Sequence, residues 1–325
     1  MKNVNTEPPA GKRAPAAPAN GAKRSAWVKI KRSGGLYLLI LPALILSICF
    51  AYIPMYGIVI AFKNYHGTLG ILGSAWAHPW NKYFLMFFRS YQFWPTLQNT
   101  MLISLYDLAA SFPLPIILAL LINQMRAVRF RKVFQTVSYL PHFISTVVMV
   151  GLLLILLSPS SGLIGAIYRM FGQTAPNLMG SADAFSHIYV WSDVWQQTGW
   201  NSIIYIAALS SVDPTLYEAA TVDGANHWQK MRYIDIPMLM PTAAILLIMG
   251  VGNIMGLGFE KVYLMQNNLN QSASEIISTY VYKIGIISSQ YSYSAAISLF
   301  NTIINLILLV TVNQITKKIS DNSLW

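Results

Sequence analysis

The chain has 325 residues, of which 55% are hydrophobic and only 10% are charged, and its mean hydropathy is +0.48. So few charges could not cover the surface of a soluble protein, and the composition therefore indicates a membrane protein. The net charge of +11 does not indicate a nucleic-acid partner, because the basic residues lie at the ends of apolar runs, where membrane lipid accounts for them. The single cysteine, Cys49, excludes a disulfide framework and a cysteine metal site.

Residues 1–35 are rich in Pro, Ala, Lys and Arg and predict a disordered, basic cytoplasmic arm that contacts membrane lipid. The apolar run that follows is too long for the core of a cleaved signal peptide, and it lacks a small-residue cleavage site. We therefore expect this run to be retained as a first membrane span.

Six apolar runs are long enough to cross a bilayer as helices, which takes about 20 residues each. The sequence therefore predicts an all-α membrane protein with six transmembrane helices, several of them kinked at prolines. A six-span domain over 36–315 would contain a cytoplasmic loop at 211–240 and be followed by a cytoplasmic tail at 316–325. The predicted spans cover about 36–62, 97–123, 137–158, 187–210, 241–263 and 294–315.

Lysine and arginine counts orient these spans. Eight basic residues lie in the N-terminal arm, four in the loop 124–136, two in the loop 211–240 and two in the tail, against six on the opposite side: Lys63, Lys82, Arg89, Arg169, Lys261 and Lys283. The positive-inside rule therefore predicts that both termini and the loop 211–240 are cytoplasmic.

The loop 211–240 has the signals of two short helices joined by a bend. Asp213 and Pro214 can cap and begin the first helix, and Gly224 can end it in a left-handed conformation. Asn226 can cap the second helix, which Pro237 would close. The alternative at this point is an ordinary hydrophilic loop.

Signals of catalysis are missing from the sequence. It has no phosphate-binding loop of the G-x-x-x-x-G-K-[ST] type and no G-x-S-x-G nucleophile motif. The five histidines are scattered without the spacing of metal ligands. We therefore expect neither a catalytic residue nor a metal site in this chain.

Polar residues inside the predicted spans fall at similar depths, near the membrane midplane where transporters place their substrates. Tryptophan faces beside amides and a carboxylate suit a sugar, whose C–H faces stack while its hydroxyls form hydrogen bonds. The predicted substrate path consists of Trp191, Asp193, Trp195, Gln196, Trp200, Asn201, Asn253 and Asn305.

Each of these assignments has a structural alternative. The tryptophans are equally expected in an interfacial belt, and Asn253 and Asn305 can instead join neighbouring helices. Asp107 also lies near the midplane, where we expect it to pair within the helix bundle. The path contains few basic residues, so it offers no evident counter-charge for an acidic sugar.

The loop 211–240 also carries a specific pattern: E-A-A, three residues, G, nine residues, then I-x-[LI]-P. It appears as Glu218-Ala219-Ala220, Gly224 and Ile234 to Pro237, with every spacing intact. This pattern resembles the ATPase-coupling loop of ABC-importer permease subunits. Further stretches resemble the branch of that family that imports oligosaccharides derived from polysaccharides such as alginate: 121–123, 129–131, 135–145, 199–205, 258–260, 280–282, 290–293 and 323–325.

The resemblance covers nearly everything after residue 36 and implies an importer in the bacterial cytoplasmic (inner) membrane. Its other subunits would be a second, non-identical permease, two ATPase subunits and an extracytoplasmic solute-binding protein. The chain would move an oligosaccharide inward by alternating access and bind no cofactor itself, because ATP and Mg²⁺ would be held by the ATPase subunits.

The resemblance also implies the residues that meet an ATPase subunit. Glu218 would contact a basic residue of a groove on that subunit, Ala219 and Ala220 would allow close approach, and Gly224 would form the bend. The full predicted coupling set is Glu218, Ala219, Ala220, Asp223, Gly224, Ile234 and Pro237. Two other functions are kept open: an ABC permease for an amino acid, peptide or polyamine, and a receptor or secondary transporter without ATPase partners.

Overall fold

The computed structural model describes residues 34–125 and 127–319. The predicted arm therefore lies outside the described residues except for its last two, as does the predicted tail beyond 319. The described residues are mostly helical, as the sequence predicts. The chain divides into two compact units, the first running to Tyr56 and the second beginning at Gly57.

In the first unit, a helix passes through one wide turn before a proline. Helix α2 (Gly34–Ser47) contains Pro42 and continues through a π-helical turn, η1 (Ile48–Tyr52), into α3 (Ile53–Met55). Pro54 cannot donate a backbone hydrogen bond to the turn before it, which explains the widening at this point.

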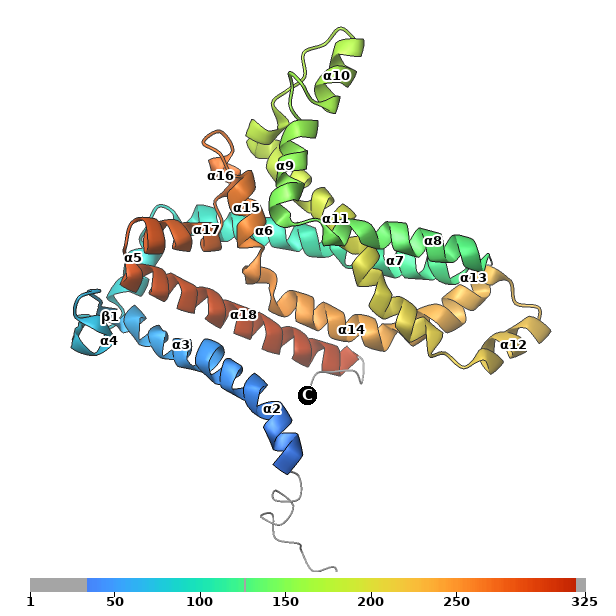
Figure 1. The fold of residues 1–325 in the computed structure, drawn as a ribbon, viewed down its shortest axis with the longest axis horizontal. Coiled ribbons are helices and arrows are strands. Elements are labelled where there is room, and N and C mark those ends of the chain that lie inside the picture. The colour runs from blue at the N-terminus through green and yellow to red at the C-terminus, as the bar shows by residue number, and fades with distance from the viewer. Residues whose placement is uncertain (1–33, 126, 320–325) are drawn as a thin grey trace, which may run out of the picture. The chain divides into compact units, whose positions relative to one another are not determined.

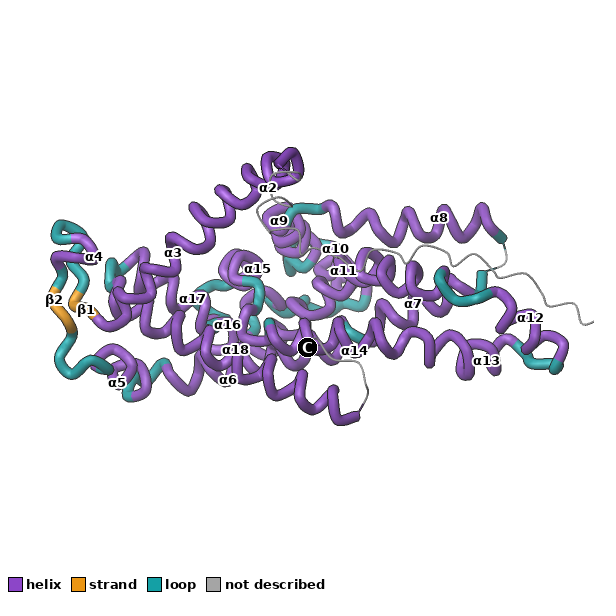
Figure 2. The backbone as a smooth tube through the Cα atoms, turned by 90° about the horizontal axis from the view of Figure 1, so that it is seen from below, coloured by secondary structure: helices purple, strands orange, loops and turns teal. Residues whose placement is uncertain are grey.

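The second unit begins inside helix η2 (Tyr56–Phe62), which is followed by a short hairpin whose strands pair Lys63 with Trp76. Figure 2 shows these strands beside α4, at the opposite end of the unit from α12 and α13. The first elements of the unit are β1 (Lys63–Asn64), α4 (Gly70–Gly73), β2 (Ala75–Trp76), α5 (Lys82–Phe88), α6 (Phe93–Ser111), α7 (Pro113–Asn123), α8 (Val128–Tyr139), η3 (Leu140–Phe143), α9 (Thr146–Leu156), α10 (Leu163–Met170) and η4 (Leu178–Gly180). The rest are α11 (Ala182–Ser210), α12 (Pro214–Val222), α13 (His227–Lys230), η5 (Met231–Asp235), α14 (Ile236–Gly252), η6 (Ile254–Gly256), α15 (Phe259–Met265), α16 (Gln271–Ser274), α17 (Ile277–Tyr282), η7 (Lys283–Ile287) and α18 (Tyr291–Ile319).

Within the described residues, four helical stretches are long and apolar enough to cross a membrane: Gly34–Phe62, Phe93–Asn123, His227–Gly252 and Tyr291–Lys318. A fifth is added if the bent pair Val128–Phe143 and Thr146–Leu156 forms one span. The predicted fourth span, 187–210, lies within the single helix α11, whose amides and carboxylates lower its hydropathy. Four or five spans are therefore supported by length and composition, and six spans stay a prediction.

Two predicted spans are not single helices. The stretch 137–158 bends by 95° between η3 and α9. At the bend Ile144 and Ser145 are extended, and the Ser145 side chain caps the N-terminus of α9 by accepting a bond from the backbone of Val148. The stretch 241–263 breaks where α14 ends at Gly252, before η6 and α15.

The break after α14 is stabilised by two side chains of α18. Asn305 Oδ1 accepts a hydrogen bond from the Met255 backbone N–H at 2.9 Å, and Asn301 Nδ2 donates to the Met255 carbonyl at 3.0 Å. Interrupted helices persist at membrane depth only where such backbone groups find partners inside the protein. These bonds explain why periodicity alone predicts a longer helix here than the structure contains.

Helix α11 is the centre of the second unit, where it packs against α6, α7, α8 and α14, while α14 lies alongside α18 (Figure 1). Gly199 allows the closest approach: a Cβ at this position would lie 1.9 Å from the Ser138 carbonyl oxygen of α8. Closer to the C-terminal ends of α7 and α11, an apolar core is formed by Leu120 of α7, Leu209 of α11 and Leu239 of α14. The core ends next to the loop that contains α12 and α13.

Candidate functional site

The first candidate site is the loop formed by α12 and α13. Helix α12 begins at Pro214 because Asp213 Oδ1 accepts the Thr215 backbone N–H at 2.9 Å. The same hydrogen bond lowers the pKa of the Asp213 carboxyl group. The helix ends before Gly224, whose φ of +75° lies in the left-handed region. The predicted cap and the predicted bend are therefore both present.

Helix α13 is fixed by a reciprocal cap. Asn226 Oδ1 accepts the Gln229 backbone N–H at 2.9 Å, and Gln229 Oε1 accepts the Asn226 backbone N–H at 2.7 Å. Lys230 Nζ donates to Thr221 Oγ1 at 2.7 Å and so links α13 to α12. The loop is thus a defined pair of helices with internal contacts.

The E-A-A residues lie on the outer face of α12. Glu218 and Ala219 are exposed, Ala220 is half-buried, and Asp223 and Gly224 are exposed at the end of the helix. A carboxylate beside small side chains can form an ion pair with a basic side chain of another protein, because the small side chains let the two surfaces approach closely. The two remaining members of the predicted set lie elsewhere: Ile234 is half-buried in η5, and Pro237 is exposed at the start of α14.

Asp235 is a residue of this loop that the sequence prediction did not include. Its side chain is fully buried, and its carboxylate accepts bonds from Tyr217 Oη at 2.5 Å and from Gln124 Nε2 at 2.9 Å. Burial, followed by the bond to Asp235, raises the pKa of Tyr217 to about 12. The sequence does contain a signal for a buried Asp235: an acidic residue lies between two isoleucines, directly before an apolar span.

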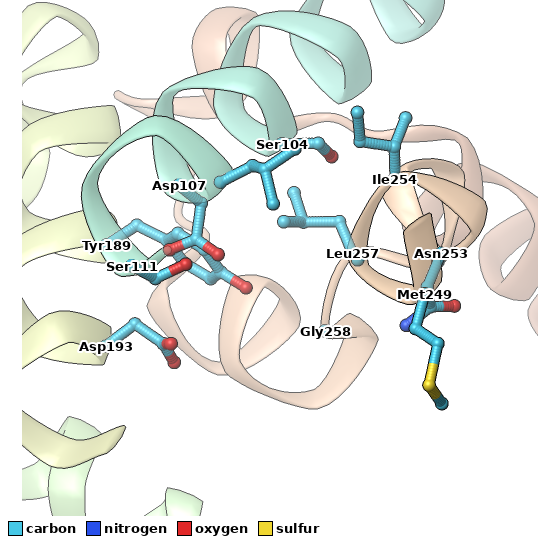
Figure 3. Close-up of a pocket in the computed structure, with 13 residues that line it drawn as sticks. Ser104, Asp107, Ser111, Tyr189, Asp193, Met249, Asn253, Ile254, Leu257 and Gly258 are labelled. Carbon is cyan, nitrogen blue, oxygen red and sulfur yellow. The ribbon is translucent and has the colours of Figure 1, made fainter. Parts of the chain in front are cut away.

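The second candidate site is a cavity of about 550 Å³ inside the second unit. Figure 3 shows Asp107, Ser111, Tyr189 and Asp193 on one side of it and Asn253 with Met249 on the other. The lining residues come from α6 (Ser104, Asp107, Leu108 and Ser111), α11 (Tyr189 and Asp193), α14 (Met249 and Gly250) and the break after it (Asn253, Ile254, Gly256, Leu257 and Gly258).

The two carboxylates of the cavity differ in their partners. Asp193 forms an ion pair with Lys261 of α15 at 3.1 Å, and Lys261 Nζ also donates to the Tyr189 carbonyl at 3.2 Å. By contrast, Asp107 Oδ1 is buried and has no hydrogen-bond partner among the described residues. The expectation that Asp107 pairs within the bundle therefore fails for this oxygen, which lies at the wall of the cavity.

The structure brings together only part of the predicted substrate path. Asp193 and Asn253 line the cavity, and Asn201 lines a smaller cavity of about 220 Å³ that shares Leu108, Ser111 and Gly250 with the first. Asn305 instead bonds to the backbone of η6, as the helix-joining alternative expects.

The remaining predicted path residues lie away from the polar cavity. Gln196 is buried and donates to the Ile144 carbonyl at 2.7 Å, which fastens the bend before α9 to α11. Trp200 stacks on His142 at 4.3 Å, and Trp191 Nε1 donates to Tyr106 Oη at 2.8 Å. Trp195 lines two pockets whose other walls are mostly apolar. Sequence reasoning missed Ser104, Ser111 and Tyr189 as lining residues, because serines and a tyrosine are common in ordinary helix packing.

Comparisons with known proteins agree with these features. The chain is 41% identical to the polygalacturonan/rhamnogalacturonan transport system permease protein YteP of Bacillus subtilis (strain 168), over 92% of each chain. It is similar to a crystal structure of a bacterial ABC transporter involved in the import of the acidic polysaccharide alginate. That match has a TM-score of 0.82 and 35% identity and covers 91% of this chain and 99% of the other.

A second crystal structure, of the bacterial alginate ABC transporter in complex with an alginate pentasaccharide-bound periplasmic protein, also has a TM-score of 0.82, with 36% identity. It matches 92% of this chain and 99% of the other. Residues 111–321, about two-thirds of the sequence, match one family throughout. The chain therefore belongs to the family of binding-protein-dependent transport system inner membrane components.

Proposed function

We propose that this chain is the permease subunit of an ATP-driven ABC importer that moves an oligosaccharide into the cytoplasm by alternating access. The observation that carries the proposal is the similarity, over more than nine-tenths of the chain, to permeases of polygalacturonan/rhamnogalacturonan and alginate transport systems. The match includes the loop with the E-A-A pattern. Amino-acid, peptide and polyamine substrates are not favoured by any of these relatives.

The complete importer would contain a second, non-identical permease, two ATPase subunits and an extracytoplasmic solute-binding protein. The family description supports dependence on a binding protein, and the alginate transporter was crystallised with its periplasmic protein. In this assembly the chain itself is not catalytic, and ATP and Mg²⁺ are bound by the ATPase subunits. Six spans with both termini in the cytoplasm would place α12 and α13 on the ATPase side.

The outer face of α12 would form the contact with an ATPase subunit. Glu218 is exposed there, and Ala219 beside it leaves room for a close approach. Coulombic attraction between Glu218 and a basic groove would hold α12 in place while ATP-driven closure moves it. Asp223, Gly224, Ile234 and Pro237 would shape the loop and its connection to α14.

The cavity would hold part of the sugar chain during transport. Carboxylate, hydroxyl and amide groups of Asp107, Ser111, Asp193 and Asn253 can form hydrogen bonds with sugar hydroxyls. No basic side chain is among the described residues that line it. The nearby Lys261 is already paired with Asp193. An acidic sugar would therefore need its counter-charge from the second permease or the binding protein.

The test is stimulation of ATP hydrolysis in the reconstituted importer. The four-subunit membrane complex is placed in proteoliposomes with its binding protein, and neutral oligosaccharides, uronate oligosaccharides, amino acids, peptides and polyamines are added in turn. We expect stimulation and uptake only with oligosaccharides. Stimulation by an amino acid, peptide or polyamine, or purification of an active transporter without ATPase subunits, would overturn the proposal.

A further inference from the structure

Two helical segments line opposite walls of the cavity, and both run from it to the same point beside α12. One is the 31-residue stretch Phe93–Asn123, formed by α6 and α7, which lines the cavity with Asp107 near its middle. The other is the stretch His227–Gly252, which contains α14 and is followed by the lining residue Asn253. At 1.5 Å per residue, roughly 25 Å separates Asp107 from Asn123 along the first segment, and about the same length separates Asn253 from Asp235 along the second.

Asp235 lies where these two segments meet. It is the last residue of η5, directly before α14, and Gln124 is the residue that caps the end of α7. The bond from Gln124 Nε2 to Asp235 Oδ2 at 2.9 Å therefore joins the end of one cavity helix to the start of the other.

The third element at this point is α12 itself. Tyr217, next to Glu218, turns inward from α12, and its hydroxyl donates to Asp235 Oδ1 at 2.5 Å. The side chain of Asn123, the last residue of α7, also lies beside the Tyr217 hydroxyl. Because the pKa of Tyr217 is raised to about 12, mainly by burial, its hydroxyl keeps the proton that it donates.

The position of these bonds makes them suited to carrying displacement. Asp235 is fully buried, and a hydrogen bond to a buried charged acceptor is costly to break without a replacement. The apolar core of α7, α11 and α14 lies next to it and keeps the three helices packed. A shift of α12 must therefore either move the ends of both cavity helices or break bonds to a buried carboxylate.

We propose that Asp235 is a positioning residue that couples α12 to both cavity helices, so that movement imposed on α12 by the ATPase subunits reaches the cavity through Tyr217, Asp235 and Gln124. Asp235 itself touches neither the solute nor the ATPase surface. The inference goes beyond the E-A-A residues, which account for docking, and rests on the proposed ATP-driven transport.

The experiment measures two rates in the same reconstituted importer: sugar uptake and sugar-stimulated ATP hydrolysis. Their ratio is compared for wild type, Asp235→Ala, Tyr217→Phe, Gln124→Ala and the double variant Tyr217→Phe/Asp235→Ala. Coupling between sites is typically 5- to 150-fold, and we expect the uptake per ATP to fall at least about fivefold in Asp235→Ala and less in the two partner variants. The double variant should be no worse than Asp235→Ala alone, because both changes remove one shared interaction.

The control is Tyr233→Phe, which removes the hydroxyl of an exposed tyrosine two residues before Asp235 and should leave the ratio unchanged. A purely structural role for Asp235 would lower the amount of assembled importer but leave uptake per ATP at the wild-type value, and this result would overturn the inference. If Asp235→Ala does not assemble, Tyr217→Phe and Gln124→Ala decide, since each removes one bond and keeps the carboxylate. A wild-type importer without sugar-stimulated ATP hydrolysis would instead contradict the proposed function.

Discussion

Lys261 and Asp193 form an ion pair at the wall of the cavity, with their charged atoms 3.1 Å apart and the lysine only 5% exposed. The pair joins α15 to α11 across the break that follows α14. It neutralises Asp193, one of the two acidic side chains near the proposed substrate path, and leaves Asp107 without an ion-pair partner among the described residues.

Lys261→Met should destabilise the importer, because it leaves the Asp193 carboxylate without its partner in a region of low dielectric constant. Removing one member of a fully buried pair costs about 3–5 kcal/mol, and the loss here should be smaller because the Asp193 side chain is 24% exposed. The double variant Lys261→Met/Asp193→Asn should recover most of this loss, because both charges are then absent. Thermal unfolding of the purified complex measures both effects, and equal melting temperatures for Lys261→Met and wild type would contradict the role of the pair.

Asp107→Asn should change which sugars are carried. The substitution keeps the size of the side chain but removes an ionisable carboxyl group whose Oδ1 has no partner among the described residues. We expect uptake of uronate oligosaccharides to rise relative to neutral ones, because an amide cannot acquire a negative charge that would repel a uronate. Asp183→Asn, at an exposed position in the first turn of α11, is the matched control and should not alter this preference.

Glu218→Lys should leave the protein in the membrane but disconnect transport from ATP hydrolysis. The change reverses the charge on the exposed face of α12 and would repel a basic groove on the ATPase subunit. Co-purification of the ATPase subunits and sugar uptake should both decline, whereas Glu218→Gln should give an intermediate result. Wild-type sugar uptake by Glu218→Lys would remove this residue from the coupling surface.

Gly224→Val should weaken the loop through backbone strain alone. Open space surrounds the position where a Cβ would be added, but the φ of +75° costs an ordinary residue about 1–2 kcal/mol. Gly224→Asn should be milder, because asparagine tolerates this conformation better. Hydrogen exchange of residues 214–230 provides the measurement, and equal protection in Gly224→Val and wild type would show that the bend adapts without cost.

Local features of the coupling loop could be predicted from the sequence because their causes are local. The caps at Asp213 and Asn226 bond to backbone groups two or three residues away, and Gly224 bends the chain at its own position. The spacing of the E-A-A pattern then indicated the family, to which the chain does belong. The docking roles of its individual residues stay predictions.

Features of the cavity depended on contacts between distant parts of the chain. Lys261 was counted as an outer charge, yet it is buried against Asp193, 68 residues earlier. Gln196 stabilises the bend at Ile144, and two asparagines of α18 stabilise the break after Gly252. The hydrophobic pattern of a sequence does not indicate such hydrogen bonds. Depth along a helix placed Asp107 near the midplane but could not show that its Oδ1 has no hydrogen-bond partner among the described residues.

The bonds from Asn301 and Asn305 to Met255 show that residues which shape the cavity need not line it. The cavity wall at 253–258 consists of the short helix η6 and the residues on either side of it. Side chains of α18 hold this wall in position, although no residue of α18 is among the described residues that line the cavity. A change in α18 can therefore alter the shape of the cavity wall without lining the cavity. Directed evolution of this protein for a new sugar should sample α18 alongside the cavity itself.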